Sequence, residues 1–272
     1  MTGEDLGQPP RALILTVLGL YVREAGGWVS VRTLIRLLAT VDVDDQAVRS
    51  SVSRLKRRGL LVAERRDGAA GYALSAYARG VLEIGDERIF ARGDHELDQW
   101  ALVVFSVPED ERQKRHTLRT RLTWLGFGTV SSGVWVGPGH LLPDARRVIE
   151  ANDLSPYVDL FRAEYLAFGD PATKVAEWWD LDALDVQYRA FLERAVPMLE
   201  RWRTTEVRAP EASFADYVRA LTMWRRLPYL DPGLPTALLP ASWRGEEASR
   251  TFFELKELLE EPAHAYVDEI VR

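Results

Sequence analysis

The sequence predicts an α+β protein in three parts, at residues 1–94, 95–168 and 169–272. Three observations support this division. The first part carries helical apolar spacing, followed by two short strands around a Gly-containing turn. The pattern changes at Trp100 to strands alternating with helices, and from Asp170 onward it is helical. We expect a helical head with a β hairpin, a mixed central domain and a helical C-terminal domain.

In the first part, helices are expected at 11–24, after Ser30, and from Asp44 to Gly59. Ser30 and Asp44 are favourable N-caps, and Gly59 follows the basic run 56–58, which is typical of a helix end. Trp28 with Val29, residues 60–65 and residues 71–74 are expected to form strands, with a turn at 67–70. Three helices followed by a hairpin predict a winged helix-turn-helix.

The third helix has two contrasting faces. Val48, Val52 and Leu55 form an apolar stripe at helical spacing. The outward face combines an amide, hydroxyls and guanidinium groups, which pair with bases and phosphates in a major groove. It consists of Gln46, Arg49, Ser50, Ser53, Arg54 and Arg57, with Arg65 and Arg66 on the hairpin as expected backbone contacts. The alternative is a solvated basic face, but the order of the surrounding elements favours double-stranded DNA.

Charge is unevenly distributed along the chain. The formal net charge is -6, yet residues 11–80 carry about twelve basic against six acidic side chains, so the acidic excess lies elsewhere. A basic head predicts salt-dependent DNA binding.

Composition excludes several classes of site. The chain has no cysteine, and its four histidines are scattered, so we expect no disulfide, metal site or cofactor. No apolar run reaches membrane-spanning length and no secretory pattern begins the chain, so we expect a cytoplasmic protein. Phosphate-loop, dinucleotide and nucleophile-elbow motifs are absent. The acids Asp180, Asp182 and Asp185 are interpreted as a solvated helix start, and the protein is predicted not to be an enzyme.

The central part predicts the order β-α-β-β-α-β of a ferredoxin-like domain. The strands are expected at 101–107, 128–131, 133–136 and 157–166, and the helices at 109–125 and 143–152.

The last part predicts a long helical stretch at 171–202 and helices at 213–226 and 246–271, with a proline-rich connection between the last two. Tryptophans at 178, 179, 202, 224 and 243 are dense for one region. They are compatible either with a packed core or with an aromatic ligand pocket.

Four motifs resemble the PaaX family of bacterial repressors across nearly the whole chain. They are WALVVFSVPE (Trp100–Glu109), LRTRLTWLGFG (Leu118–Gly128), GVWVGP (Gly133–Pro138) and WRRLPYLDPGLPTALLPASWRG (Trp224–Gly245). The resemblance implies a homodimeric repressor of catabolic genes that binds a palindromic operator. In the founding type of the family, phenylacetyl-coenzyme A releases the DNA.

A small-molecule effector such as an aryl-acyl-coenzyme A thioester is therefore expected, although its identity stays open. The candidate effector residues are Arg219, Trp224, Arg225, Arg226 and Tyr229. Guanidinium groups suit the phosphates of such a ligand. The same arginines are equally suited to ion pairs with acidic helices.

Two alternatives belong to other classes. The central part also resembles the endoribonuclease-type subunit of CRISPR spacer acquisition, in which an aspartate at the end of the first strand binds metal. Here Ser106 occupies that place, and a lone serine is a poor ligand for a hard cation. The central part is therefore interpreted as a dimerisation and coupling scaffold. The second alternative is a non-catalytic scaffold whose head binds protein.

Overall fold

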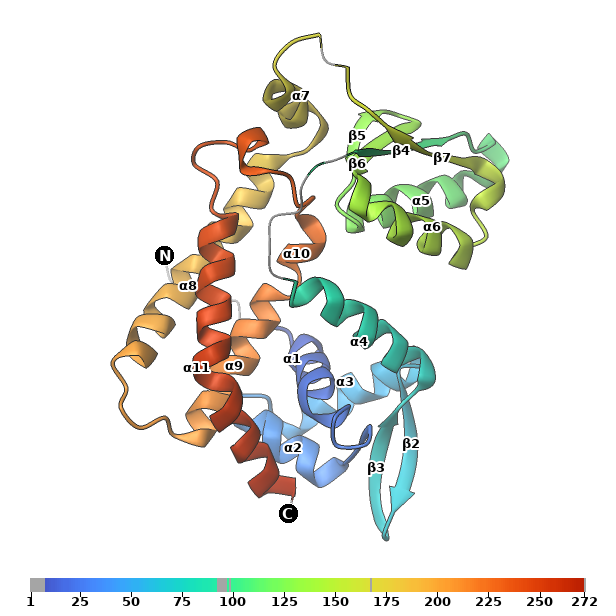
Figure 1. Ribbon diagram of the computed structural model, residues 1–272. Coiled ribbons are helices and arrows are strands. Elements are labelled where there is room, and N and C mark those ends of the chain that lie inside the picture. Colours follow the sequence, from blue (N-terminus) through green and yellow to red (C-terminus); the bar gives the residue numbers. More distant parts are fainter. Residues whose placement is uncertain (1–7, 92–96, 98, 167, 272) are drawn as a thin grey trace, which may run out of the picture. The chain divides into compact units, whose positions relative to one another are not determined.

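The computed structural model describes residues 8–91, 97, 99–166 and 168–271 (Figure 1). The chain divides into two compact units. The first contains residues up to Phe90 together with Phe191–Arg225 and Glu247–Arg272. The second contains Ala91–Ala190 and Arg226–Glu246. The C-terminal helices therefore contribute to both units, and the predicted boundary at residues 94 and 95 lies outside the described residues.

The N-terminal segment of the first unit has the predicted order of helices and strands. Its elements are α1 (Pro10–Val17) continuing into a π-helical turn (Leu18–Val22), β1 (Trp28–Ser30), α2 (Val31–Ala39), α3 (Asp45–Arg57), β2 (Leu61–Arg66), β3 (Ala69–Leu74) and α4 (Ala76–Ile89). The strands form an antiparallel sheet in the order β1-β3-β2. Apolar side chains of α1, α2 and α3 are buried, including Leu13, Leu34 and Leu55.

The hairpin turn is tighter than predicted. The expected turn covered residues 67–70, but β3 already begins at Ala69, so only Asp67 and Gly68 connect the strands. Both have positive φ, at 49° and 80°. An Asp-Gly pair with two positive φ angles is the preferred two-residue hairpin turn, because its twist matches that of the strands.

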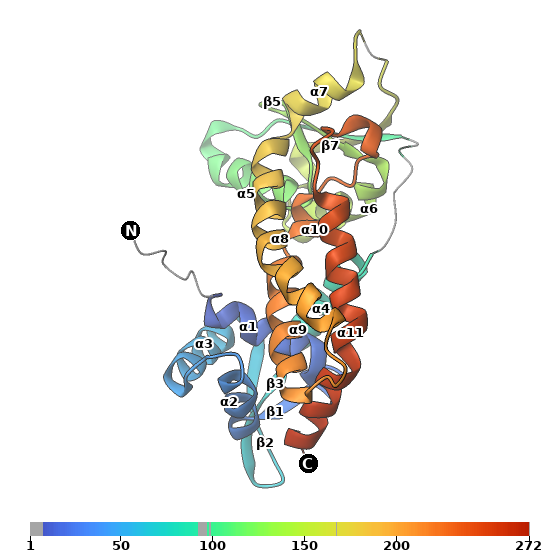
Figure 2. The same cartoon turned by 90° about the vertical axis from the view of Figure 1, so that its left-hand side faces the viewer.

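The first unit also contains α9 (Pro210–Trp224) and most of α8 (Leu181–Arg203) and α11 (Gly245–Val271). Figure 2 shows α9 and α11 side by side. Helix α1 packs on α9, where the hydroxyls of Thr16 and Thr222 lie 2.7 Å apart in a buried hydrogen bond. The ring of Tyr21 lies 5.4 Å from that of Phe214. The N-terminal helices therefore share their core with helices about 200 positions later in the chain.

The second unit contains the predicted β-α-β-β-α-β order. It comprises β4 (Trp100–Phe105), a 3-10 turn (Glu109–Glu111), α5 (Arg112–Trp124), β5 (Gly128–Ser131), β6 (Val134–Pro138), a 3-10 turn (Gly139–Leu141), α6 (Leu142–Ala151), a 3-10 turn (Ser155–Tyr157) and β7 (Val158–Ala163). The sheet is antiparallel, in the order β5-β6-β4-β7. One face packs on α5 and α6 through a core that includes Val103, Leu118 and Ile149 (Figure 1).

The other face of this sheet is covered by later segments of the same unit. These are α7 (Pro171–Trp178) and the proline-rich connection, which contains α10 (Leu227–Leu230) and a 3-10 turn (Thr236–Leu238). Side chains of Trp100 and Val136 from the sheet pack there with Val175, Trp179 and Leu234. The proline-rich motif thus supplies apolar anchors to a second core layer.

The prediction of one helical stretch over 171–202 is wrong in one respect, because two helices occupy it. Trp179 has extended backbone angles (φ -119°, ψ 141°), and its indole donates a hydrogen bond of 2.8 Å to the carbonyl oxygen of Gly126. Asp180 then accepts from the backbone N–H of Ala183 and begins α8. A tertiary contact of Trp179 therefore accompanies the break between α7 and α8.

The interpretation of Asp185 as a solvated acid is also wrong. This carboxylate is only 6 % exposed, accepts from the backbone N–H of Arg244 at 3.1 Å and pairs with Arg189 at 2.5 Å. Its role in the second unit is to hold the end of the proline-rich connection.

Candidate nucleic-acid interface

Helix α3 is fixed at both ends by local interactions. The Asp44 carboxylate accepts from the backbone N–H of Ala47 at 2.7 Å, which satisfies a donor of the first turn. At the other end Gly59 has φ 72°, and its N–H donates to the carbonyl oxygen of Lys56, while that of Leu60 donates to Leu55. This pair of bonds is a Schellman motif, which needs a left-handed residue at the glycine position.

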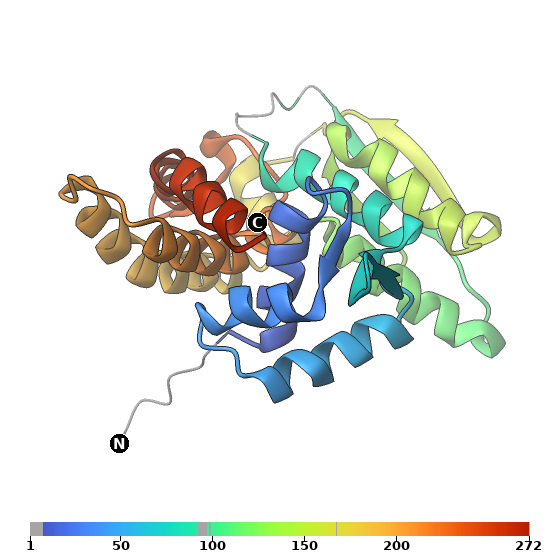
Figure 3. The ribbon, with the colours of Figure 1, turned by 90° about the horizontal axis from the view of Figure 1, so that it is seen from below.

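The predicted stripe of α3 is buried, since Val48, Val52 and Leu55 are each at most 1 % exposed. Ser51 joins them on the buried side. All six predicted recognition residues are exposed, and Figure 3 shows α3 along the outer side of the N-terminal helices. The fold therefore leaves the whole proposed face open to a partner.

The six side chains differ in their present contacts. Arg49 pairs with Asp45 one turn earlier, with 2.5 Å between Nε and Oδ1, and this hydrogen bond raises the pKa of the guanidinium above its ordinary value. Arg54 donates to the hydroxyls of Ser50 and Ser51, both at 3.1 Å. Within the described part of the chain, the Arg57 side chain has no hydrogen-bond or ion-pair partner. Arg57 is thus the most available cation on the face.

The hairpin arginines lie in different environments. Arg65 donates to the carbonyl oxygen of Gly68 at 3.0 Å, at the tip. Arg66 pairs with Glu64 at 2.6 Å, and its Cζ lies 5.5 Å from the centre of the Trp28 ring. Arg65 is therefore held at the tip, whereas Arg66 is held against the sheet.

Gly71 allows β1 to approach β3. A Cβ there would lie 2.4 Å from the carbonyl oxygen of Val29 and 2.5 Å from the Trp28 ring. The indole of Trp28 also donates to the carbonyl oxygen of Glu64 at 3.3 Å. These contacts fix the hairpin to the third strand.

Among the other exposed cations of this unit are Arg32, Lys56 and Arg58, which the sequence did not indicate as contacts. Lys56 and Arg58 belong to the same basic run as Arg57. Only the charge of Lys56 and Arg58 could have indicated a role in DNA binding, because helical spacing places both residues away from the outward face of α3.

The candidate effector residues divide between the two units. Trp224 is 4 % exposed, stacks on Phe252 with ring centres 4.9 Å apart, and donates to the carbonyl oxygen of Ile89. Arg219 pairs with Asp42 at 2.6 Å. Arg225 donates to the carbonyl oxygen of Ala12. In the first unit, these three residues all have contacts within the fold.

The other two candidates belong to the second unit. Arg226 is exposed and precedes α10, and the half-buried ring of Tyr229 lies 5.4 Å from that of Trp124. The Trp124 side chain is 53 % exposed. An accessible aromatic pair between α5 and α10 therefore includes one of the predicted residues, Tyr229. The sequence alone did not indicate its partner Trp124.

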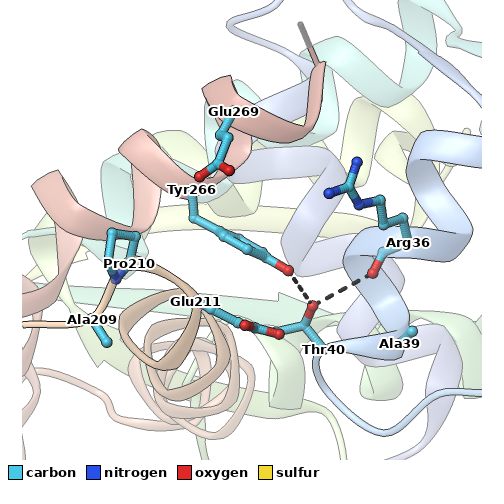
Figure 4. A pocket seen from close by; sticks show the side chains of 8 residues that line it. All are labelled: Arg36, Ala39, Thr40, Ala209, Pro210, Glu211, Tyr266 and Glu269. Carbon is cyan, nitrogen blue, oxygen red and sulfur yellow. Dashed lines mark hydrogen bonds between the residues drawn. The ribbon is translucent and has the colours of Figure 1, made fainter.

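An open pocket of about 650 Å³ lies at the end of α2 in the first unit (Figure 4). Its lining comes from α2, from the start of α9 and from α11, and comprises Arg36, Ala39, Thr40, Ala209, Pro210, Glu211, Tyr266 and Glu269. The hydroxyls of Thr40 and Tyr266 lie 2.8 Å apart across it. The pocket contains none of the five predicted effector residues.

Ser106 at the end of β4 is exposed, and its backbone N–H donates to the carbonyl oxygen of Tyr157. Across the described ranges, no group of three or more His, Cys, Asp or Glu side chains is placed to hold a metal ion. No helix in the described part of the chain is long and apolar enough to cross a membrane.

Three family descriptions match successive parts of the chain. They are PaaX-like protein at residues 9–78, PaaX protein central Cas2-like domain at 95–175 and PaaX-like protein C-terminal domain at 179–269. The chain belongs to the PaaX-like family. The PaaX-like fold thus consists of an N-terminal PaaX domain, a central Cas2-like domain and a helical C-terminal domain.

The PaaX-like chain is 25% identical over 264 residues to the transcriptional repressor PaaX of Escherichia coli. The match covers 95% of this chain and 83% of that protein, which makes the two distant homologues. An uncharacterized protein from Mycobacterium tuberculosis has a similar structure, with a TM-score of 0.59 and 23% identity. That similarity covers 97% of this chain and 100% of the other, and it concerns the fold alone.

Proposed function

We propose that the protein is a transcriptional repressor without enzymatic activity, which binds a specific DNA operator through a winged helix-turn-helix. Helix α3 enters the major groove, and the β2–β3 hairpin contacts the phosphate backbone. The observation that carries this proposal is the fully exposed polar and basic face of α3, on a helix capped at both ends. Homology to a transcriptional repressor supports it.

In this proposal, base recognition belongs to Gln46, Arg57 and the serines, and the backbone contacts belong to the hairpin. Gln and Arg pair bidentately with adenine and guanine, whereas contacts to phosphate carry no sequence information. One helix contacts too few bases for useful selectivity, so two chains bind a palindromic site as a homodimer.

The test is a gel shift with DNA from upstream of the protein's own gene, with and without competitor DNA. Arg57→Ala is expected to reduce discrimination between operator and competitor by about 1–3 kcal/mol. Replacing Arg65 or Arg66 is expected to weaken binding to all duplexes equally, with a salt slope lower by about one. The matched control is Arg162→Ala, an exposed arginine of β7. An unchanged operator preference in Arg57→Ala contradicts the role of α3.

The effector in this proposal is a small molecule with an aromatic ring and an anionic group, of the aryl-acyl-coenzyme A class. The accessible candidates for its site are Arg226 and Tyr229 with the neighbouring Trp124, since guanidinium and aromatic groups suit such a ligand. A ligand releases DNA only if it binds the dimer geometry that does not fit the operator more tightly than the geometry that does.

Isothermal titration with phenylacetyl-coenzyme A, combined with operator release, tests this ligand. Tyr229→Ala is expected to abolish the heat of binding, and Tyr266→Ala in the pocket of Figure 4 is the matched control. If Tyr266→Ala loses binding and Tyr229→Ala keeps it, the effector site is the pocket of Figure 4 instead. Absence of both heat and release in the unmodified protein excludes this ligand.

A further inference from the structure

A long segment of the central domain contains no acidic residue. From Arg112 to Pro143 the chain has no Asp or Glu, although the whole protein has 41 acidic among 272 residues. The same segment carries five Lys or Arg side chains, all of them on α5. In a protein with a net charge of -6, such a concentration of positive charge indicates an interaction surface.

The structure divides these cations into two groups. Lys114 pairs with Glu111, and Arg115 pairs with Glu109 at 2.9 Å, so the acidic 3-10 turn before α5 neutralises them. Arg112, Arg119 and Arg121 are exposed, and no ion pair to them occurs among the described residues. The second group is available to an anionic partner.

Two of the available arginines lie on one face of α5. Arg112, His116 and Arg119 follow the spacing i, i+4, i+7, which aligns side chains along a helix, and Thr123 continues the line. Leu118 and Leu122 occupy the buried side. The distance along the helix between Arg112 and Arg119 is about 10 Å.

The β5–β6 hairpin adds neutral donors beside this line. Arg119 donates to the carbonyl oxygen of Ser132 at 3.2 Å, which places the turn between β5 and β6 next to the helix. Ser131 and Ser132 are exposed there. We call Arg112, His116, Arg119, Ser131 and Ser132 the α5 surface.

The chemistry of the α5 surface suits phosphate groups. Guanidinium and hydroxyl groups are the usual donors to the nucleic-acid backbone, and none of the five residues carries a carboxylate that would repel it. The lack of carboxylates also means that it cannot hold a hard divalent cation, so it suits binding of phosphodiesters without cleavage.

We propose that the α5 surface is a second DNA contact, which binds the phosphate backbone of duplex DNA outside the bases contacted by α3. This inference rests on the proposed function, because it extends the contact of the same protein with its operator. Its contribution is independent of sequence, so it adds affinity and salt dependence without changing base preference.

The experiment measures binding of the full-length protein to a labelled operator duplex with long flanks, by fluorescence anisotropy over a range of salt concentrations. The variant is Arg112→Ala with Arg119→Ala. Loss of two phosphate contacts is expected to reduce the log–log salt slope by about 1.8 for each bound chain and to weaken binding several-fold. Discrimination against competitor DNA is expected to stay unchanged. On a duplex shortened to the operator itself, the difference from the unmodified protein is expected to disappear.

Two further variants control this experiment. Arg146→Ala with Arg162→Ala removes the same charge from exposed positions on α6 and β7, and its slope is expected to equal that of the unmodified protein. Arg112→Lys with Arg119→Lys keeps the charge and is expected to restore most of the slope. Thermal unfolding checks that all variants are folded.

Three outcomes overturn the proposal. The first is an alanine variant that matches the unmodified protein on the long duplex. The second is an equal loss of slope in the α6 and β7 control. The third is a loss of binding to single-stranded RNA while duplex binding is unchanged, which assigns the surface to RNA. If the unmodified protein shows no preference for the operator, the proposed function itself fails, and this result is distinct from all three.

Discussion

Among single residues, Asp45 in the first turn of α3 has two roles. Asp45 satisfies the preference of a helix N-terminus for a carboxylate, and it also pairs with Arg49. The position of Asp45 indicated the first role only. An arginine paired with a carboxylate has fewer N–H groups free for phosphate, and the carboxylate repels the phosphate, so Asp45 is expected to restrain DNA binding.

Asp45→Asn is therefore expected to increase affinity for duplex DNA several-fold and to raise the salt slope by about one, because Arg49 is released to a phosphate. Anisotropy titrations over a range of salt concentrations measure both quantities. Glu83→Gln, which removes an equal charge from an exposed position of α4, is the control. Equal affinity of Asp45→Asn and the unmodified protein contradicts a role for Arg49 in binding.

Trp224 illustrates the difference between a residue that suits a ligand and one that forms the core. Because its ring is buried against Phe252, Trp224→Ala is expected to lower the free energy of unfolding by about 3–5 kcal/mol. Arg226 is exposed, so Arg226→Ala is expected to change the free energy of unfolding by less than about 0.5 kcal/mol. Urea denaturation followed by circular dichroism compares them. A Trp224→Ala protein of normal stability that has lost only effector binding excludes the core role.

Among secondary-structure elements, the β2–β3 hairpin depends on two kinds of glycine. Gly68 provides a positive φ in the turn, which its sequence context predicts. Gly71 lies in a strand, and its lack of a side chain matters because the backbone of β1 and the Trp28 ring approach it closely. Only the three-dimensional packing distinguishes the second role.

Gly71→Ala is expected to destabilise the protein by about 1–3 kcal/mol, since the added Cβ would displace the backbone of β1. Gly80→Ala on α4 is the matched control. A Cβ at Gly80 meets no atom within 4 Å, so this substitution is expected to be neutral or stabilising by up to about 1 kcal/mol. Thermal unfolding distinguishes the two. Equal stability of both variants contradicts the close approach of β1 to Gly71.

For the whole molecule, the main feature is that the first compact unit is built from three separate segments of the chain. Several interactions join its N-terminal helices to the C-terminal ones, among them those of Thr16 with Thr222, Arg219 with Asp42, and Tyr266 with Thr40. The DNA-reading part of the proposed repressor therefore shares a core with helices that follow the central domain. Such shared packing provides a direct route by which changes in α9 or α11 affect α2 and α3.

A fragment of residues 1–94 is expected to be much less stable than the full chain, because it would expose the side of α1 that packs on α9. Urea denaturation is expected to give a lower midpoint for the fragment, with increased binding of a hydrophobic dye to the folded form. If the fragment and the first unit of the full chain unfold at the same urea concentration, the N-terminal domain is stable without α9 and α11.

Much of the fold was predictable because the responsible interactions are local. Ser30 and Asp44 cap their helices through the backbone N–H groups three residues later, so the residue type and its position suffice. The alternation of Ala101, Val103 and Phe105 with Trp100 and Leu102 likewise follows from the geometry of a strand with both faces covered. Exposure of the six predicted residues on α3 follows from the position of its apolar stripe.

The sequence by itself determined the order of the helices and strands up to β7, the two ends of α3, the outward face of that helix and the family. Those features depend on spacing and on residues a few positions apart. The tertiary structure decided that Trp224 is buried, that Asp185 holds the backbone of Arg244, and that Trp179 separates α7 from α8. It also decided that α1 shares a core with α9. Each of these depends on partners far away in the sequence, up to 206 positions for Thr16 and Thr222. Local periodicity carries no information about which distant surfaces meet.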